Sequence, residues 1–299
     1  MKILVAGSDG FIGRNVYRTL KEGDNAVVGL SRPGLGEDYG VDLSNYNDVE
    51  AVMRQIQPEV IINCAGVVSV DGDLDANKDI SVNLLTAALA PHSNLRRFIM
   101  CGSAGEYGVV SPEDYPIKET QSLAATQPYP LSKIAEERAI KEIGRSKSID
   151  VIIARIFNPI GPKMAPRFLV SGILRQIDAL RSGELNFIEV GRLDAPRDYI
   201  DITDVANAIG HLATTMTHNY QEYNIGSGVP IKNGQLIELM LEKSGFDKSV
   251  TIKETSSKPE EPIASQADIT RMKDDFGWSP QISLEETIKG VIEHHEEKS

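Results

Sequence analysis

The chain has 299 residues, of which 41% are hydrophobic and 25% charged, and a formal net charge of −12. This length suits one large domain or two, and the composition is that of an ordinary soluble globular protein. The acidic balance, with no local cluster of Lys and Arg, argues against a nucleic-acid partner, because such a partner needs a basic face.

Neither a membrane nor a metal ion is expected as a partner. No stretch approaches the roughly 20 apolar residues of a membrane span, and the N-terminal "MKILVAG" is too short for a signal sequence, which predicts a cytoplasmic protein. Cys64 and Cys101 lie in apolar runs and are expected to be buried and reduced. The five histidines are scattered, and none stands at ligand spacing from a Cys or an acid, so we predict no metal site.

Apolar runs of strand length alternate with segments of helical periodicity through the first half of the chain. The predicted strands are 2–6, 26–31, 60–65, 96–102 and 151–156, and the predicted helices are 11–23, 48–57, 77–90 and 129–143. Continuous apolar runs separated by helices are typical of parallel strands that are covered on both faces. The expected fold class is therefore α/β, with a Rossmann-type doubly wound parallel sheet.

The pattern changes after residue 157, where Pro and Gly become frequent and helices no longer alternate regularly with strands. We therefore predict an NAD(P)-binding Rossmann domain over 1–157, with a return segment near 199–216. Residues 158–299 are expected to form mainly a smaller, substrate-binding region. Its last segment is predicted to be an amphipathic helix, whose His294 and His295 are expected to be solvated.

A glycine motif stands between the first strand and the first helix. In "GSDGFIG", Gly7, Gly10 and Gly13 have the spacing G-x-x-G-x-x-G. Glycines at these places let the chain turn sharply and approach a pyrophosphate, while the helix N-terminus supplies N–H donors. A purely structural turn is the alternative, but the start of a βαβ pattern favours a dinucleotide site.

The end of the second strand bears on which dinucleotide is bound. It reads "GLSRPG", with Ser31 and Arg32 in place of the acid that holds the ribose hydroxyls in NAD-binding folds. Arg32 is suited to a 2′-phosphate, so NADP(H) is favoured and NAD(H) is the alternative cofactor. Arg32 as a merely solvated loop residue is the competing interpretation. Asp42, at the end of the following short segment, is expected beside the adenine.

Tyr129 and Lys133 in "YPLSK" lie one helical turn apart on one face. A free phenol has a pKa of about 10, and an adjacent ammonium lowers it by stabilising phenolate. The Lys can also hold the cofactor ribose. Ser103 ends strand 96–102, where the ligand crevice of such a sheet begins, and is expected to bind the substrate oxygen. The alternative is an idle surface pair.

These motifs together resemble the extended short-chain dehydrogenase/reductases, also called the NAD-dependent epimerase/dehydratase family, over essentially the whole chain. The resemblance rests on the three glycines, Asn83, "SAGEYG" (103–108), Tyr129 with Lys133, "RIFNPIGP" (155–162) and "RDYIDITDV" (197–205). It implies that Tyr129 is the catalytic acid/base, that Lys133 is its partner and a ribose ligand, and that Ser103 donates a hydrogen bond to the substrate.

The resemblance also implies which residues bind the cofactor and a nucleotide-diphosphate sugar. The cofactor residues would be Gly7, Asp9, Gly10, Phe11, Ile12, Gly13, Ser31, Arg32, Asp42, Leu43, Cys64, Ala65, Gly66, Asn83, Tyr129 and Lys133. The substrate residues would be Ser103, Glu106, Tyr129, Asn158, Arg167, Arg197 and Lys258. Asn158 and Arg197 are expected near the diphosphate, whereas solvated or structural roles are equal alternatives for Arg167 and Lys258.

Within the family, the chain looks most like the GDP-4-dehydro-6-deoxy-D-mannose reductases that make GDP-rhamnose. This likeness implies NAD(P)H-dependent reduction of the C4 keto group of a nucleotide-linked 4-keto-6-deoxyhexose. Family dehydratases carry Asp-Glu directly after the Ser/Thr, where this chain has Ala104 and Gly105. A UDP-sugar 4-epimerase with tightly bound NAD is the alternative. "NPIGPKM" and Lys258-Pro259 depart from the reductase pattern and leave the nucleotide base and the sugar open.

Other classes of protein fit less well. A dinucleotide-sensing module would keep the glycine motif but would not need Tyr129 and Lys133. A serine hydrolase would need Gly where "CGSAG" begins with Cys101. Family members usually dimerise through helices equivalent to 77–90 and 129–143, which implies a homodimer.

Overall fold

The computed structural model describes residues 1–35, 38–68, 73–90, 93–246, 250–255 and 265–297. Its centre is a seven-stranded parallel sheet in the order β11-β6-β5-β4-β1-β2-β3. These strands are β1 (Lys2–Ala6), β2 (Ala26–Ser31), β3 (Tyr39–Gly40), β4 (Val60–Asn63), β5 (Arg97–Ser103), β6 (Asp150–Ile156) and β11 (Glu222–Ile225). The strand order reverses between β1 and β4, which creates a crevice at the carboxyl ends of the strands.

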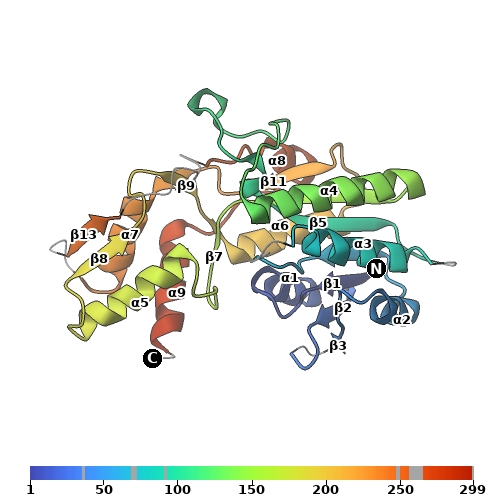
Figure 1. Cartoon of the computed structure of the whole chain (residues 1–299), viewed down its shortest axis with the longest axis horizontal. Helices are drawn as coiled ribbons and strands as arrows, with labels where there is room; N and C mark the ends of the chain where they lie inside the picture. The colour runs from blue at the N-terminus through green and yellow to red at the C-terminus, as the bar shows by residue number, and fades with distance from the viewer. Residues whose placement is uncertain (36–37, 69–72, 91–92, 247–249, 256–264, 298–299) are drawn as a thin grey trace.

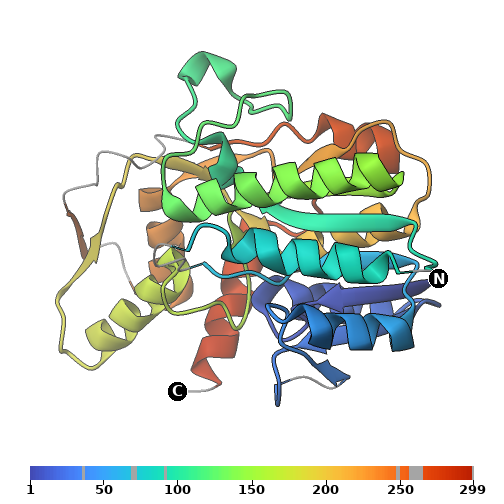
Figure 2. The same cartoon turned by 45° about the vertical axis from the view of Figure 1, so that its right-hand side comes forward.

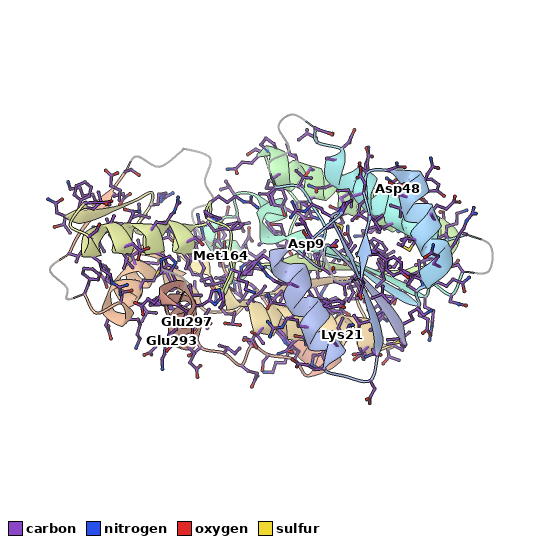
Figure 3. All side chains as sticks on the ribbon, turned by 90° about the horizontal axis from the view of Figure 1, so that it is seen from below. Asp9, Lys21, Asp48, Met164, Glu293 and Glu297 are labelled. Carbon is purple, nitrogen blue, oxygen red and sulfur yellow. The ribbon has the colours of Figure 1, made fainter. Side chains whose placement is uncertain are left out.

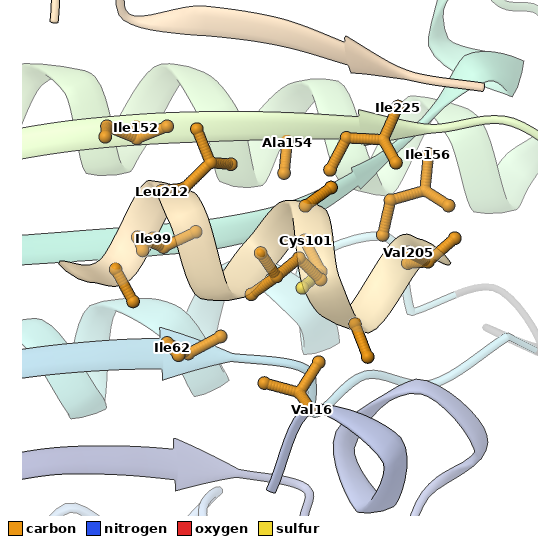
Figure 4. Close-up of a cluster of buried hydrophobic side chains, with 14 of the residues drawn as sticks. Val16, Ile62, Ile99, Cys101, Ile152, Ala154, Ile156, Val205, Leu212 and Ile225 are labelled. Atoms are coloured by element: carbon orange, nitrogen blue, oxygen red, sulfur yellow. The ribbon is translucent and has the colours of Figure 1, made fainter. Parts of the chain in front are cut away.

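Helices cover both faces of the sheet (Figures 1 and 2). One face carries α1 (Phe11–Lys21) and α6 (Ile202–Thr214), and the other carries α2 (Tyr46–Ile56), α3 (Ala76–Ala88) and α4 (Pro128–Lys147). Because side chains alternate along a strand, Ile3 and Val5 of β1 belong to the first core, and Leu4 belongs to the second. Figure 4 shows the first core, where α6 packs its apolar side chains against the strands.

The predicted doubly wound α/β fold is confirmed, with shifts of a few residues at the element ends. Two short strands of this sheet were not predicted from the sequence: β3 at one edge and β11 at the other. Both α6, which packs in the first core, and β11, which pairs with β6, return to the sheet. α8 (Thr270–Phe276) also packs here, and its Met272 is fully buried in the first core.

The smaller region is built around a separate core (Figure 1). It contains α5 (Leu169–Arg181), α7 (Asn233–Lys243), α9 (Leu284–Glu296), and the parallel pair β8 (Phe187–Val190) and β13 (Thr251–Glu254). Two further strand pairs join it to the sheet: β7 (Pro159–Ile160) with β10 (Ile200–Asp201), and β9 (Pro196–Asp198) with β12 (Pro230–Lys232).

The predicted C-terminal helix is present as α9, but its histidines are not solvated as expected. His295 Nε2 lies 2.6 Å from a carboxylate oxygen of Asp178 on α5. His294 Nε2 is buried, with no hydrogen-bond partner in the described part of the chain. Both rings are half-buried because α9 packs into the core of the smaller region.

Candidate active site

The glycine loop follows β1 and leads into α1. Gly7 has a positive φ of +75°, and a Cβ there would lie 2.8 Å from the Ala65 Cα. A Cβ on Gly13 would lie only 2.1 Å from the Gly7 carbonyl oxygen. No side chain caps the N-terminus of α1 at Gly10, so the first N–H groups of the helix are free to bind an anion. This cradle fits a dinucleotide pyrophosphate.

The other predicted cofactor residues lie at the same edge of the sheet. Because the strands are parallel, the segments after β1, β2, β4 and β5 all leave from their carboxyl ends. Figure 3 shows Asp9 at the end of α1 that faces the smaller region and Met164, with Lys21 at the opposite end. Phe11 and Ile12 are half-buried in the first turn of α1.

The loop after β4 packs under the glycine loop. The Cys64 N–H donates to the Ala6 carbonyl at 3.0 Å, and the Cys64 thiol lies 3.4 Å from that of Cys101. Both cysteines are free thiols; Cys101 is buried, and Cys64 is half-buried. A Cβ on Gly66 would lie 3.1 Å from the amide oxygen of Asn77, so a larger residue there would require the Asn77 side chain to shift.

Of the two residues that end β2, Arg32 is the one presented to a ligand. Ser31 is buried, and its hydroxyl lies within hydrogen-bond distance of two main-chain carbonyls. The guanidinium of Arg32 is 76% exposed and donates to one oxygen of Asp9 at 2.9 and 3.0 Å. Arg32 is therefore held beside the glycine loop by an acid of that loop.

Asn83 fixes the loop that contains the predicted adenine contacts. Its amide donates to the carbonyls of Leu43 and Ser44 at 3.1 and 3.2 Å. Asp42 is exposed, and the hydroxyl and N–H of Ser44 lower the pKa of its carboxyl group. Asn83 thus acts on Asp42 and Leu43 through the main chain.

Ser103 ends β5 with its hydroxyl available for donation. Its Oγ accepts the N–H of Gly105 at 3.1 Å, so the hydroxyl hydrogen is left for another acceptor. Glu106 lies beneath it, in the short helix η1 (Ala104–Tyr107), and is fully buried, with an oxygen 2.6 Å from the Ser103 nitrogen. In this structure Glu106 supports the main chain of the serine, and its contact with the substrate stays a prediction.

Tyr129 and Lys133 lie near the start of α4, one turn apart. Tyr129 is half-buried and Lys133 is buried, with its Nζ 2.6 Å from a carboxylate oxygen of Glu136. Burial raises the pKa of Tyr129; Lys133 lowers it, and Glu136 and Glu106 raise it further. Lys133 thus acts in the expected direction, but burial outweighs it, and the net pKa of Tyr129 lies above the ordinary value. Tyr129 is therefore protonated at neutral pH, as a general acid must be, while its raised pKa makes it a weaker acid than a free phenol.

A buried polar network around this pair was missed. Glu136 accepts from Ser81 and Asn63 as well as from Lys133. Asn77 bonds both main-chain groups of Val67, and donates to Ser132 on α4 at 2.8 Å. The available signal was a polar residue in an otherwise apolar strand, since Asn63 ends "VIIN".

The predicted substrate residues lie on several elements of the smaller region. The amide of Asn158 donates to the Asp198 carbonyl at 2.7 Å and to the Ser265 hydroxyl at 3.3 Å, and its neighbour in the structure, Arg197, is half-buried on β9. Arg167 is exposed just before α5, with its guanidinium 5.1 Å from the centre of the Phe168 ring. Lys258 lies outside the described residues. Thus Asn158 is bonded to Asp198, the residue that follows Arg197 on β9, and Arg167 lies on a separate element.

Neither a metal site nor a membrane-spanning helix is found among the described residues. No three or more of their His, Cys, Asp and Glu side chains form a group that could hold a metal ion. No helix among them is long and apolar enough to cross a membrane.

The sheet, the glycine cradle and the Ser-Tyr-Lys constellation define an enzyme that uses a nicotinamide dinucleotide. The model of the NAD dependent epimerase/dehydratase family matches residues 3–226, and the chain belongs to this family. The resemblance expected from the sequence is thereby confirmed.

Individual relatives include both reductases and epimerases. The chain is 26% identical to GDP-6-deoxy-D-mannose reductase of Pseudomonas aeruginosa, over 99% of this chain and 98% of that protein. The structure of RMD from Pseudomonas aeruginosa complexed with NADPH matches with a TM-score of 0.87 and 27% identity, covering 100% and 99% of the two chains. UDP-glucose 4-epimerase from Thermotoga maritima with UDP-glucose matches with a TM-score of 0.88 and 25% identity, covering 100% and 99%.

Proposed function

We propose that the protein reduces the C4 keto group of a nucleotide-linked 4-keto-6-deoxyhexose. The observation that carries this proposal is the arrangement of two donors, the hydroxyl of Ser103 and the protonated phenol of Tyr129, at the carboxyl edge of a dinucleotide-binding sheet. A ketone oxygen that becomes an alcohol needs a hydrogen bond as charge develops, and then a proton.

Each residue of the constellation has a distinct role in this reaction. When bound, the reduced nicotinamide supplies hydride. Ser103 donates its hydroxyl hydrogen to the ketone oxygen, and Tyr129 gives that oxygen its proton. Lys133 stabilises the phenolate left behind and, through its remaining N–H groups, is suited to hold the ribose.

The serine loop argues against dehydration. Elimination of water needs a further acid and base beside the sugar, and the loop has Ala104 and Gly105 where family dehydratases have acids. Its single acid, Glu106, is fully buried and engaged by the Ser103 N–H. The loop therefore suits reduction or epimerisation.

NADPH is the cofactor that we propose, because Arg32 is exposed at the end of β2 and can reach a 2′-phosphate. The NADPH complex of RMD is consistent with this assignment. For the substrate, Arg197 and Asn158 are the proposed diphosphate contacts. A homodimer through α3 and α4 is proposed from the family resemblance.

The test is an incubation of the enzyme and NADPH with GDP-, dTDP-, UDP- and CDP-linked 4-keto-6-deoxyhexoses. Loss of the near-ultraviolet absorbance of the reduced nicotinamide with one of them supports the proposal and identifies the base. Tyr129→Phe should abolish this loss while still binding NADPH. If none of the substrates is reduced, the proposal is wrong.

The second candidate is a UDP-sugar 4-epimerase, favoured by the match to the Thermotoga enzyme. An epimerase oxidises and reduces the same sugar, so it must keep its cofactor between turnovers. NAD that remains on the protein through purification, with interconversion of UDP-glucose and UDP-galactose, would favour this function over a reductase.

A further inference from the structure

Glu136 lies on α4, almost one turn beyond Lys133, and none of its side chain is exposed. One carboxylate oxygen is 2.6 Å from the Nζ of Lys133. The other accepts the hydroxyl of Ser81 at 2.6 Å and the amide of Asn63 at 3.3 Å. Three elements, β4, α3 and α4, therefore place donors around this single carboxyl group.

The hydrogen-bond contacts suit an ionised Glu136: burial raises the pKa of its carboxyl group, and Lys133, Ser81 and Asn63 oppose that rise. An ammonium and an amide nitrogen can only donate hydrogen bonds, so both carboxylate oxygens act as acceptors. Burying a charge without a partner is strongly unfavourable, and here each charge is the partner of the other. Burial alone would lower the pKa of Lys133, but Glu136 and its other neighbours raise it above the ordinary value, so Lys133 stays an ammonium.

We propose that Glu136 is a positioning residue: it holds the Lys133 ammonium in place and offsets its charge, so that Tyr129 stays a phenol until the ketone is reduced. This inference rests on the proposed reductase function and names a residue that tunes it. In the reaction, the carbonyl carbon takes up hydride with its electron pair, and the carbonyl oxygen takes the Tyr129 proton. The resulting phenolate then faces Lys133.

The charged and titratable groups around Tyr129 set the direction of this effect. Lys133 on α4 favours the phenolate, whereas Glu136 on α4, Glu106 on η1 and Cys101 on β5 oppose it. Of the opposing groups, Glu136 is the one bonded directly to Lys133. Removing its charge leaves the ammonium uncompensated and should shift the titration of Tyr129 downwards.

Two further features lie around the groups that face Tyr129. The thiol of Cys64 lies against that of Cys101, and Glu137 forms an ion pair with Arg155. Glu137 offers a matched control, since it is also buried on α4 but pairs with Arg155 at 2.9 Å, away from Lys133. Among the described residues its carboxylate contacts Arg155 and Lys141, not Tyr129 or Lys133.

The experiment follows the Tyr129 ring by NMR in protein labelled with carbon-13 at the tyrosine Cζ, without substrate, and assigns it with Tyr129→Phe. We expect Glu136→Gln to lower the titration midpoint by about one pH unit or more, and Glu137→Gln to leave it in place. Glu136→Asp keeps the negative charge, so its titration midpoint for Tyr129 should lie between those of Glu136→Gln and the wild-type protein. An unchanged midpoint in a folded Glu136→Gln protein would overturn the proposal.

A second measurement needs no variant of Glu136. In the wild-type protein, the Glu136 carboxyl carbon, assigned by triple-resonance spectra, should have the chemical shift of a carboxylate at neutral pH. A carboxylic acid shift would equally overturn the proposal. Because both titrations are made without substrate, their outcome is separate from that of the substrate panel: a failed panel with a shifted Tyr129 would reject the reductase but not the coupling.

Discussion

Glu106 shows, at the scale of one residue, how burial can turn a carboxylate into a group that titrates near neutral pH. Its side chain is fully buried, one oxygen accepts the Ser103 N–H at 2.6 Å, and the other oxygen has no partner in the described part of the chain. Burial, followed by the charge of Glu137, raises the pKa of Glu106 to about 8. Its charge state therefore affects the stability of the serine loop.

The pKa of Glu106 predicts how stability depends on pH. An unfolded Glu has a pKa of about 4.3, so between there and about pH 8 the folded chain keeps a proton that the unfolded chain releases. This term makes the free energy of unfolding fall as the pH rises, and it levels off above the folded pKa. Glu106→Gln removes the term. Between about pH 5 and pH 9, the free energy of unfolding of Glu106→Gln should therefore rise by on the order of 2–4 kcal/mol relative to that of wild type.

Urea unfolding of both proteins at the two pH values measures this difference. Gln keeps an oxygen for the Ser103 N–H, which is why it is preferred to Ala. Equal pH slopes for wild type and Glu106→Gln would show that Glu106 does not change its protonation in this range.

Arg32 makes a prediction about the cofactor. If its exposed guanidinium binds a 2′-phosphate, Arg32→Ala should weaken NADPH binding about tenfold or more, because charge-assisted hydrogen bonds contribute about 1.5–3 kcal/mol. NADH lacks the phosphate, and its affinity should change little. Quenching of nicotinamide fluorescence gives both dissociation constants. The matched control is Arg54→Ala, which removes another well-exposed arginine that pairs with Glu50 on α2. A parallel loss of NADH affinity in Arg32→Ala would contradict the assignment.

Sequence reasoning could predict Ser103, Tyr129 and Lys133 because their signals are local: a strand end, and a spacing of one helical turn. The partners of Glu136 could not be predicted this way. They lie 55 and 73 positions away in the sequence, and only the packing of α3 and α4 against β4 brings them together. For the same reason the sequence predicted how Lys133 acts on Tyr129 but not the opposing effects of burial and Glu136.

At the scale of elements, β1, the glycine loop and α1 are joined by main-chain hydrogen bonds and close contacts. The Gly7 N–H donates to the Leu30 carbonyl on β2, and the Gly10 N–H donates back to the Gly7 carbonyl at 2.9 Å. The close approach of Gly13 to that carbonyl sets the position of α1 on the loop. The pyrophosphate cradle therefore depends on the absence of a side chain at Gly13.

Gly13→Ala should weaken dinucleotide binding about tenfold or more and destabilise the fold by about 1–3 kcal/mol. The reason is steric, since the new Cβ would stand 2.1 Å from a main-chain oxygen that cannot rotate away. Gly290→Ala on α9 is the control, because a Cβ there meets no atom within 4 Å and favours the helix. Unfolding temperature and cofactor titration test both variants, and normal NADPH binding by Gly13→Ala would count against the cradle.

The elements of the smaller region were harder to predict for a physical reason. Its strands are two to four residues long, too short to show a periodic pattern, and each pairs with a partner far along the chain. β13, for example, pairs with β8, so that Thr251 is opposite Phe187. In the first half, by contrast, longer and mostly buried strands alternate with amphipathic helices, and most of these leave a local signal in the sequence.

At the scale of the whole molecule, three acids of "RDYIDITDV" join the C-terminal part of the chain to the sheet. Asp198 accepts from Ser227, Gly228 and Ala267. The other two acids lie at the start of α6: Asp201, which caps the helix, accepts the hydroxyl of Thr287 at 2.8 Å, and Asp204 accepts the N–H groups of Gln281 and Ile282 at 3.0 and 2.9 Å. Segments with little regular structure are thereby fixed by hydrogen bonds to buried or partly buried carboxylates.

Asp198 is the acid closest to the proposed diphosphate contacts, because its carbonyl oxygen accepts the amide of Asn158 at 2.7 Å. Its carboxylate makes four hydrogen bonds of 2.6 to 2.9 Å, and none of the residue is exposed. Asp198→Ala leaves three main-chain N–H groups without their acceptor and should cost about 3–5 kcal/mol of stability. Urea unfolding measures this loss.

The same variant should also separate substrate binding from cofactor binding. Loosening the chain around Asp198 disturbs Asn158 and the neighbouring Arg197, so KM for the nucleotide sugar should rise while the NADPH dissociation constant stays near the wild-type value. Asp204→Ala is the comparison: it frees the N–H groups of Gln281 and Ile282, on the far side of α6, and should lower stability without raising KM. If both variants raise KM alike, the rise reflects a general destabilisation of the fold. The residues around Asp198 would then not bind the diphosphate.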